Sequence, residues 1–295
     1  MKHTLRVTSI VLAIFFFTQI LGLIIINNYI DKQQLAEGNI VFKELPLNVE
    51  RPVVDAKTSF IYLVVAILLG TVLALLLIRF KVMSLWKLWF FLAVFITLSV
   101  AFKTFITELI AVFLALLFSF WKIYKPNFYV HNFTELFIYG GLAAIFVPIL
   151  NLFSVVMLLI LISVYDAYAV WKSKHMIKLA KFQTKSKMFA GVMIPYELPK
   201  KVSGPKKLVK IKTAILGGGD IGFPLLFAGV LFKDLLLNNS VMISFAKVLV
   251  IPVLATAALG WLLYKADKDK FYPAMPFIST GCFIALGIMW IAGFI

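Results

Sequence analysis

Charged residues and cysteine are both scarce in this chain of 295 residues. Only 14% of the residues are charged, compared with about 25% in a typical soluble domain, and 62% are hydrophobic. The single cysteine, Cys282, excludes an internal disulfide and a cysteine-rich metal site. The three histidines, His3, His131 and His175, are scattered, so a histidine metal site is not expected either. The composition therefore predicts an all-α, polytopic membrane protein, a single domain of packed helices that needs no metal or other cofactor.

Hydrophobic runs predict nine membrane spans. They cover residues 7–30, 58–78, 84–102, 104–121, 133–149, 151–171, 213–237, 241–264 and 273–295. The block 133–171 is too long for one crossing, and Pro148 and Asn151 mark the place where it should turn back. We expect one membrane domain over residues 1–295, with spans one to six in 1–171, a lysine-rich loop over 172–212 and spans seven to nine in 213–295. The low apolar content of that loop predicts a mobile or partly disordered segment.

The net charge of +16 is distributed unevenly over the segments that join these spans. If the N-terminus is cytoplasmic, most of the 29 lysines and arginines lie on the cytoplasmic side, twelve of them in residues 172–212 alone. This bias alternates correctly through all nine spans, as the positive-inside rule requires. We therefore expect a multi-pass protein of the cell membrane with a cytoplasmic N-terminus and an outside C-terminus. The charge then reflects topology and attraction to the lipid bilayer, and no nucleic-acid partner is needed to explain it.

Five acidic residues fall within the predicted spans: Glu108, Glu135, Asp166, Asp220 and Asp234. An ionised side chain at the centre of a membrane helix costs about 2.5–3.5 kcal/mol, so such residues are functional candidates. Glu108 lies near Lys103 and the hairpin turn between two spans, Glu135 lies close to a span end, and Asp234 adjoins Lys233. Exposure at the membrane interface accounts for these three. It does not account for Asp166 and Asp220.

Asp166 and Asp220 lie at matched depths on two antiparallel spans that are adjacent in the sequence. Asp166 is about 7.5 Å and Asp220 about 10.5 Å from the cytoplasmic end, at about 1.5 Å per residue. Two carboxylates that meet in a low-dielectric site cannot both ionise easily, so one keeps a proton while the other is charged. A water between them can then be deprotonated by one acid while the other protonates a carbonyl oxygen. This chemistry hydrolyses peptide bonds.

Glycines and prolines lie at the same depth as the two acids. Gly217, Gly218 and Gly219 directly precede Asp220 in the run AILGGGDIGFP, where they would let a substrate chain approach the backbone. Close helix packing is the alternative explanation for a glycine triplet in a span. Pro273 and Pro276 open the last span, either as a plain helix start or as a source of free backbone groups for an extended substrate.

These motifs resemble those of the presenilin and signal peptide peptidase family of intramembrane aspartyl proteases. That family has nine spans, with Tyr-Asp in the sixth, Gly-x-Gly-Asp in the seventh and Pro-Ala-Leu at the ninth. The matching residues here are Tyr165 and Asp166, then Gly217, Gly218, Gly219 and Asp220, then Pro273 and Ala274, with Met275 in place of leucine. The resemblance covers the whole chain in motif order, and the small size resembles the archaeal members.

The resemblance implies that Asp166 and Asp220 form the catalytic pair and that the other motif residues shape the active site or bind substrate. It implies transmembrane helices of other membrane proteins as substrates. The orientation inferred from the lysines is that of the presenilin branch, which favours substrates whose own N-terminus is outside. The sequence leaves open a homo-oligomer.

Two other functions fit parts of the pattern. An ion- or proton-coupled transporter would also use intramembrane carboxylates and broken helices, but no second glycine-rich, Asp-bearing span supports the inverted repeat of such proteins. A prepilin-peptidase-like protease also uses Gly-x-Gly-Asp, but that family usually has lysine two residues after the Asp, where this chain has Gly222.

Overall fold

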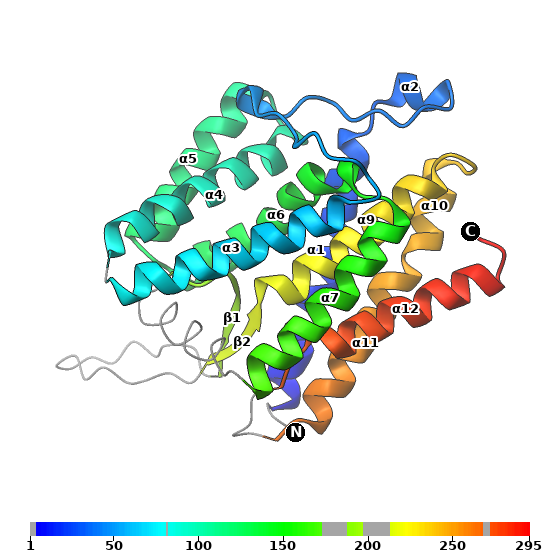
Figure 1. The fold of residues 1–295 in the computed structure, drawn as a ribbon. Helices are drawn as coiled ribbons and strands as arrows, with labels where there is room; N and C mark the ends of the chain where they lie inside the picture. The colour runs from blue at the N-terminus through cyan, green and yellow to red at the C-terminus, as the bar shows by residue number, and fades with distance from the viewer. Residues whose placement is uncertain (1–3, 81, 173–187, 197–212, 268–271) are drawn as a thin grey trace.

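The computed structural model describes residues 4–80, 82–172, 188–196, 213–267 and 272–295. Ten longer helices make up most of this part of the chain (Figure 1). They are α1 (Leu5–Tyr29), α3 (Ser59–Arg79), α4 (Met83–Lys103), α5 (Glu108–Tyr124), α6 (Phe128–Phe146), α7 (Leu152–Trp171), α9 (Gly218–Leu235), α10 (Val241–Val248), α11 (Val250–Lys265) and α12 (Met275–Ile291). The short helix α2 (Lys32–Ala36) and a 3-10 turn at Pro46–Asn48 lie in the loop after α1.

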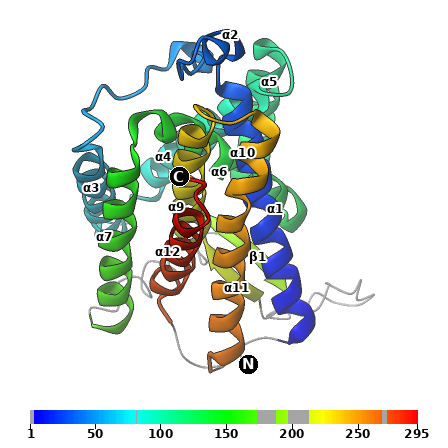
Figure 2. The same ribbon diagram turned by 90° about the vertical axis from the view of Figure 1, so that its right-hand side faces the viewer.

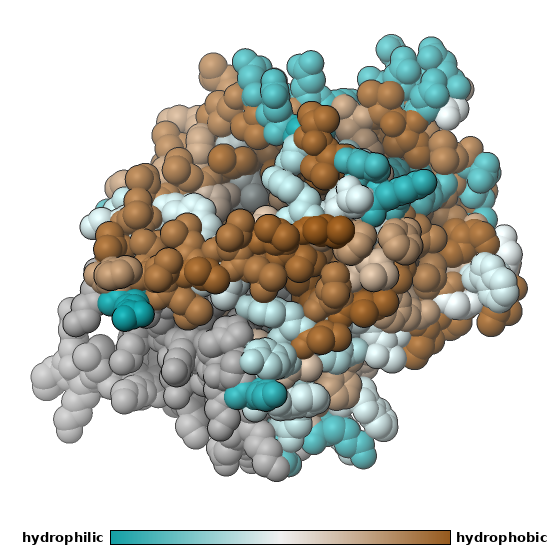
Figure 3. Space-filling model, viewed as in Figure 1, coloured by the Kyte–Doolittle hydropathy of each residue, from teal (hydrophilic) through white to brown (hydrophobic). Residues whose placement is uncertain are grey.

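The outer surface of the helices is apolar, as a lipid environment requires. The face of α3 carries exposed Leu68, Leu69 and Leu73, and hydrophobic residues form a continuous band there with hydrophilic residues at the two ends (Figure 3). Within the described residues, six helices are long and apolar enough to cross a membrane. They are α1, α3, α4, α6 with its following turn, α7, and α10 joined to α11. The prediction of a helical, multi-pass membrane protein is confirmed at this level.

Two predicted turns between spans are present. The block 133–171 breaks at a 3-10 turn over Val147–Ile149, and α7 then begins with Asn151 as its N-cap, whose side chain accepts a hydrogen bond from the Ser154 N–H at 2.8 Å. The other turn separates α4 from α5. There Lys103 and Glu108 form a salt bridge of 2.8 Å.

Helix α9 is the centre of the molecule, and α1, α6, α7, α11 and α12 pack around it (Figures 1 and 2). It is apolar on all sides, and Phe227 and Phe232 are fully buried. A helix that is hydrophobic all round belongs in a core of this kind.

A two-stranded antiparallel sheet lies at one end of the bundle, next to the start of α9 (Figure 1). Strand β1 (Gly191–Pro195) pairs with β2 (Thr213–Gly217), with Gly191 opposite Gly217 and Pro195 opposite Thr213. The predicted helical span from residue 213 is therefore wrong in its first five residues, and the all-α prediction missed this hairpin. The apolar run TAILG is extended because it pairs with β1, and the helix starts only at Gly218.

The hairpin also revises the prediction for residues 172–212. Residues 173–187 and 197–212 lie outside the described residues, so the prediction of mobility there is not addressed. Residues 188–196 are ordered, and the side chains of Met188, Val192 and Ile194 are buried. This short apolar stretch supplies the strand that the lysine-rich composition of the whole loop conceals.

Candidate active site

The two predicted acids meet where α7 packs against α9. Asp166 is on α7 and is buried, whereas Asp220 is on the first turn of α9 and is half-buried. The two carboxyl groups are close enough to repel each other electrostatically. The prediction that two distant sequence positions form one pair therefore agrees with the geometry.

Asp166 accepts hydrogen bonds from the start of α12. The backbone N–H of Met275 donates to Oδ2 of Asp166 at 3.1 Å, and the N–H of Ala274 donates to the same carboxyl group. The N-terminus of a helix carries unpaired N–H groups and a partial positive charge, so it stabilises a carboxylate. The sequence predicts that Pro273 and Pro276 leave backbone groups free for a substrate. At Ala274 and Met275, these N–H groups instead donate to Asp166.

Asp220 lies at a helix start of its own. Gly217 is the N-cap of α9, and its N–H donates to the Asp220 carboxyl group three residues later. This is the arrangement in which an acidic side chain at the third helical position reaches back to the N-cap N–H. Two helix N-termini therefore converge on the two acids, one from α12 and one from α9.

The three glycines have different surroundings. A Cβ atom at Gly218 would lie 2.8 Å from the hydroxyl of Tyr139, a buried residue of α6. Only glycine therefore fits at this position without moving the Tyr139 side chain. The N–H of Gly218 donates to the Ala190 carbonyl at 3.1 Å and ties α9 to the end of the hairpin. Gly219 is exposed, and a Cβ there would meet only the Phe223 ring, at 3.3 Å. Gly219 therefore faces the open side of the site.

Tyr165 and Pro273 border the site. The Tyr165 hydroxyl lies 3.4 Å from Oγ1 of Thr71, so the ring points toward α3 and lines an apolar groove between α3 and α7. Pro273 is buried just before α12. It precedes the two N–H groups that bind Asp166.

Three polar residues next to the site were not predicted. Glu135 was attributed to the membrane interface, but its side chain is 1% exposed and pairs with Lys122 at 2.6 Å. Tyr139 donates a short hydrogen bond to the same carboxylate. The spacing of Glu135 and Tyr139 by one helical turn was the available signal, but Lys122 had been assigned to a loop.

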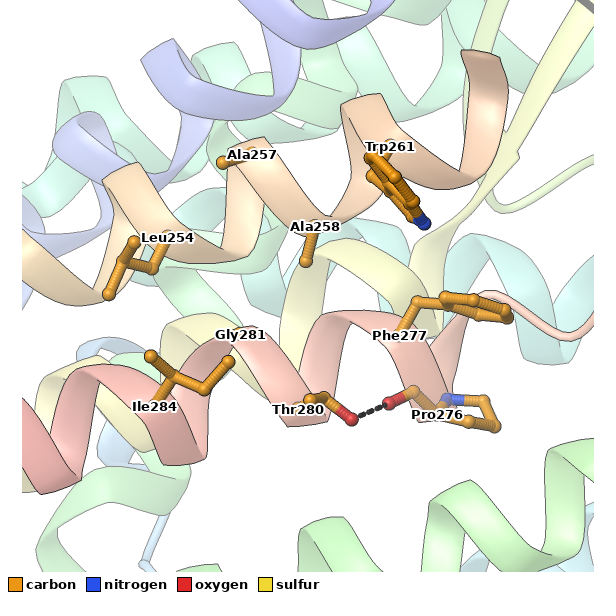
Figure 4. A pocket seen from close by; sticks show the side chains of 9 residues that line it. All are labelled: Leu254, Ala257, Ala258, Trp261, Pro276, Phe277, Thr280, Gly281 and Ile284. Atoms are coloured by element: carbon orange, nitrogen blue, oxygen red, sulfur yellow. Dashed lines mark hydrogen bonds between the residues drawn. The ribbon is translucent and has the colours of Figure 1, made fainter. Parts of the chain in front are cut away.

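An open, apolar pocket lies between α11 and α12 (Figure 4). It has a volume of about 490 Å³ and is lined by Leu254, Ala257, Ala258, Trp261, Pro276, Phe277, Thr280, Gly281 and Ile284. None of these side chains is an acid or a base, and the Thr280 hydroxyl is bonded to the Pro276 carbonyl at 2.7 Å. Among the described residues no cluster of three or more histidine, cysteine or acidic side chains could hold a metal ion.

The chain is similar to known proteins in sequence and in fold. The family described as "Signal-peptide peptidase, presenilin aspartyl protease" matches residues 12–294. Two solved structures of a presenilin family intramembrane aspartate protease, from crystals in space groups C222 and P2, are each 18% identical to this chain, with TM-scores of 0.63 and 0.61. The first match covers 95% of this chain and 97% of the other, and the second covers 96% of both. No curated protein matches the chain. The chain belongs to the signal-peptide peptidase and presenilin family of intramembrane aspartyl proteases.

Proposed function

We propose that Asp166 and Asp220 are the catalytic pair of this protease. One carboxylate takes a proton from a water whose oxygen bonds to the substrate carbonyl carbon, while the other acid gives its proton to the carbonyl oxygen. Protonation of the amide nitrogen then lets the C–N bond break, leaving a new carboxyl group and a new amine. The observation that carries this assignment is the convergence of two helix N-termini, through Met275 and Gly217, on two acids that interact with each other.

The outer edge of β2 is the place where a substrate can bind in extended form. Gly191 and Met193 of β1 direct their backbone groups toward side chains of α6. Because these directions alternate along a strand, the register leaves Thr213, Ile215 and Gly217 with their backbone groups on the outer edge of β2. Gly217 is also the residue whose N–H binds Asp220. A substrate strand added to this edge would therefore bring its peptide bonds next to the carboxylates.

A transmembrane substrate must lose helical structure before it can bind there. In a membrane helix every backbone group is bonded internally, so the scissile peptide is shielded until a segment unwinds. Backbone hydrogen bonds to β2 would replace those that the substrate helix gives up. The substrates are therefore proposed to be transmembrane helices with a segment that unwinds readily.

Nine crossings and a cytoplasmic N-terminus complete the proposal. Helices α5 and α12 have 17 residues each and α9 has 18, so each spans about 26 Å at about 1.5 Å per residue. These three helices add to the six longer ones. With the lysine-rich side inside, the hairpin and the two acids lie toward the cytoplasm, and substrates with an outside N-terminus are favoured.

The experiment is cleavage, in cells that make this protein, of one apolar span presented in both orientations. We expect products from the substrate with its N-terminus outside, with the new termini mapped by mass spectrometry inside the span. Cleavage confined to flanking loops would contradict the assigned substrate class. Preferential cleavage of the inverted substrate would contradict the assigned topology.

A further inference from the structure

A buried ionic network lies between α5, α6 and β1, beside the start of α9. Lys122 and Glu135 pair at 2.6 Å, and each side chain is 1% exposed. The Lys122 ammonium group has two further acceptors, the Thr134 hydroxyl at 2.9 Å and the His131 carbonyl at 3.4 Å. All three of its donors are therefore satisfied without water.

Stability alone is a weak reason for such a pair. Removing two charges from water is costly, and replacing a buried ion pair by apolar residues of similar size is often neutral or stabilising. Membrane helices have no need of an ion pair to hold them together, since small and apolar residues pack well. The pair is better explained by what its second carboxylate oxygen holds.

Oε2 of Glu135 is shared by two groups that lead to the active site. It accepts a hydrogen bond from the Tyr139 hydroxyl and another from the Gly191 N–H at 3.0 Å. Tyr139 is the side chain against which Gly218 packs, and its hydroxyl interacts electrostatically with Asp220. One oxygen atom of Glu135 therefore positions two groups. They are the Tyr139 side chain, which packs against Gly218 at the start of α9, and Gly191 at the start of β1.

The same face of α6 fixes the register of the hairpin. Nε2 of His131 is 2.7 Å from the Gly191 carbonyl oxygen, and Asn132 bonds both the N–H and the carbonyl of Met193 at 3.0 and 2.7 Å. Gly191 has φ of 143° and leaves no room for a side chain, since a Cβ there would lie 2.2 Å from the Leu216 carbonyl oxygen. Strand β1 thus has one position, and it sets the position of β2, which leads directly into Gly217 and Asp220.

We propose that Glu135, oriented by Lys122, is a positioning residue for proteolysis. It holds Tyr139 and β1 so that β2 presents its open edge and α9 starts in register with Asp166. This role rests on the proposed function of Asp220. Without the acceptor oxygen, Tyr139 and Gly191 each lose a partner, β1 can shift, and Asp220 moves relative to Asp166 and to the bound substrate.

Two double variants separate the acceptor oxygen from the charge. Lys122→Met with Glu135→Gln removes both charges and keeps an oxygen for Tyr139 and Gly191, whereas Lys122→Met with Glu135→Leu removes the oxygen as well. We expect the Leu variant to lose about 10- to 100-fold in kcat on an intact single-span substrate, with a smaller change in KM, because a misplacement of about 1 Å has effects of this size. The kcat of the Gln variant should be about 10-fold higher than the kcat of the Leu variant.

A matched control is available at the other end of the bundle. Half-buried Lys103 and exposed Glu108 form a pair of 2.8 Å, and replacing them by Met and Leu should leave kcat unchanged. The mapped cleavage positions give a second readout, because a shifted strand register would move them and a purely structural loss would not. Equal kcat and identical cleavage positions in the Gln and Leu variants would overturn the proposal.

Tyr139→Phe keeps the test decisive if the Leu variant does not fold. It leaves Glu135 bonded to Lys122 and Gly191 and removes only the hydroxyl against Gly218. We expect about a 10-fold loss of kcat with an unchanged melting temperature, and wild-type kcat would overturn the proposal. Retained cleavage by Asp220→Asn would instead reject the catalytic pair, so the two failures are distinguishable.

Discussion

Replacing either Asp166 or Asp220 by Asn is expected to lower kcat by about 1,000-fold or more, because an amide can neither take the proton of the attacking water nor protonate the carbonyl oxygen. Asn has nearly the volume of Asp, and its oxygen can still accept one of the N–H groups that bind each carboxylate. The fold should therefore persist. Single-turnover cleavage of a purified single-span substrate measures the loss.

The thermal unfolding of both variants serves as the control for this result. Each removes a charge from a partly enclosed pair, so the melting temperature in detergent should stay the same or rise. A folded Asp166→Asn or Asp220→Asn variant that cleaves at the wild-type rate would remove that residue from the catalytic pair.

Gly219→Leu is expected to lower cleavage of an intact transmembrane substrate by about 100-fold, because the new side chain would occupy the exposed side of the first turn of α9. A short peptide that is already unwound should lose less, since it can adapt to the narrower approach. The ratio of kcat/KM values for the two substrates measures the difference. An unchanged kcat/KM on the intact substrate would contradict an approach over Gly219.

Pro273→Ala should behave differently from Gly219→Leu. Alanine lets α12 extend toward its N-terminus, and the N–H groups of Ala274 and Met275 would then serve the helix instead of Asp166. Because this change acts on the carboxylate, kcat should fall by a similar factor on the intact substrate and on the peptide. Gly287→Leu is the matched control for Gly219→Leu. It adds the same side chain to another helical glycine, where no atom lies within 4 Å of a Cβ.

The helical, multi-pass architecture and the proximity of Asp166 to Asp220 could be predicted because hydropathy and proline positions are local signals. The hairpin could not, since TAILG is apolar and runs directly into an apolar helix, and its partner strand is hidden in a lysine-rich segment. The direction of each acid's hydrogen bonds was equally hidden. The hydrogen bonds to Asp166 depend on how the start of α12 packs against α7. The residue spacing within either helix does not predict that packing.

The network around Glu135 shows a second kind of limit. An acid near a span end is usually explained by exposure, and that explanation failed because Lys122, thirteen residues earlier, folds back across the turn between α5 and α6. Lys122 lies one residue beyond the predicted span 104–121, whereas α5 continues to Tyr124. Helix ends are the least certain feature of a hydropathy profile, and here an error of three residues at one helix end concealed an ion pair.

The most direct measurement compares two peptides that differ only at the scissile bond, one with the amide and one with a secondary alcohol in place of its carbonyl carbon. The alcohol mimics the tetrahedral species that Asp166 and Asp220 are proposed to hold between them. The wild-type protein should bind the alcohol at least about 100-fold more tightly than the amide, and either Asp→Asn change should remove that preference. Equal affinity of the wild-type protein for both peptides, or a preference that survives in Asp166→Asn or Asp220→Asn, would contradict a site built from these two carboxylates.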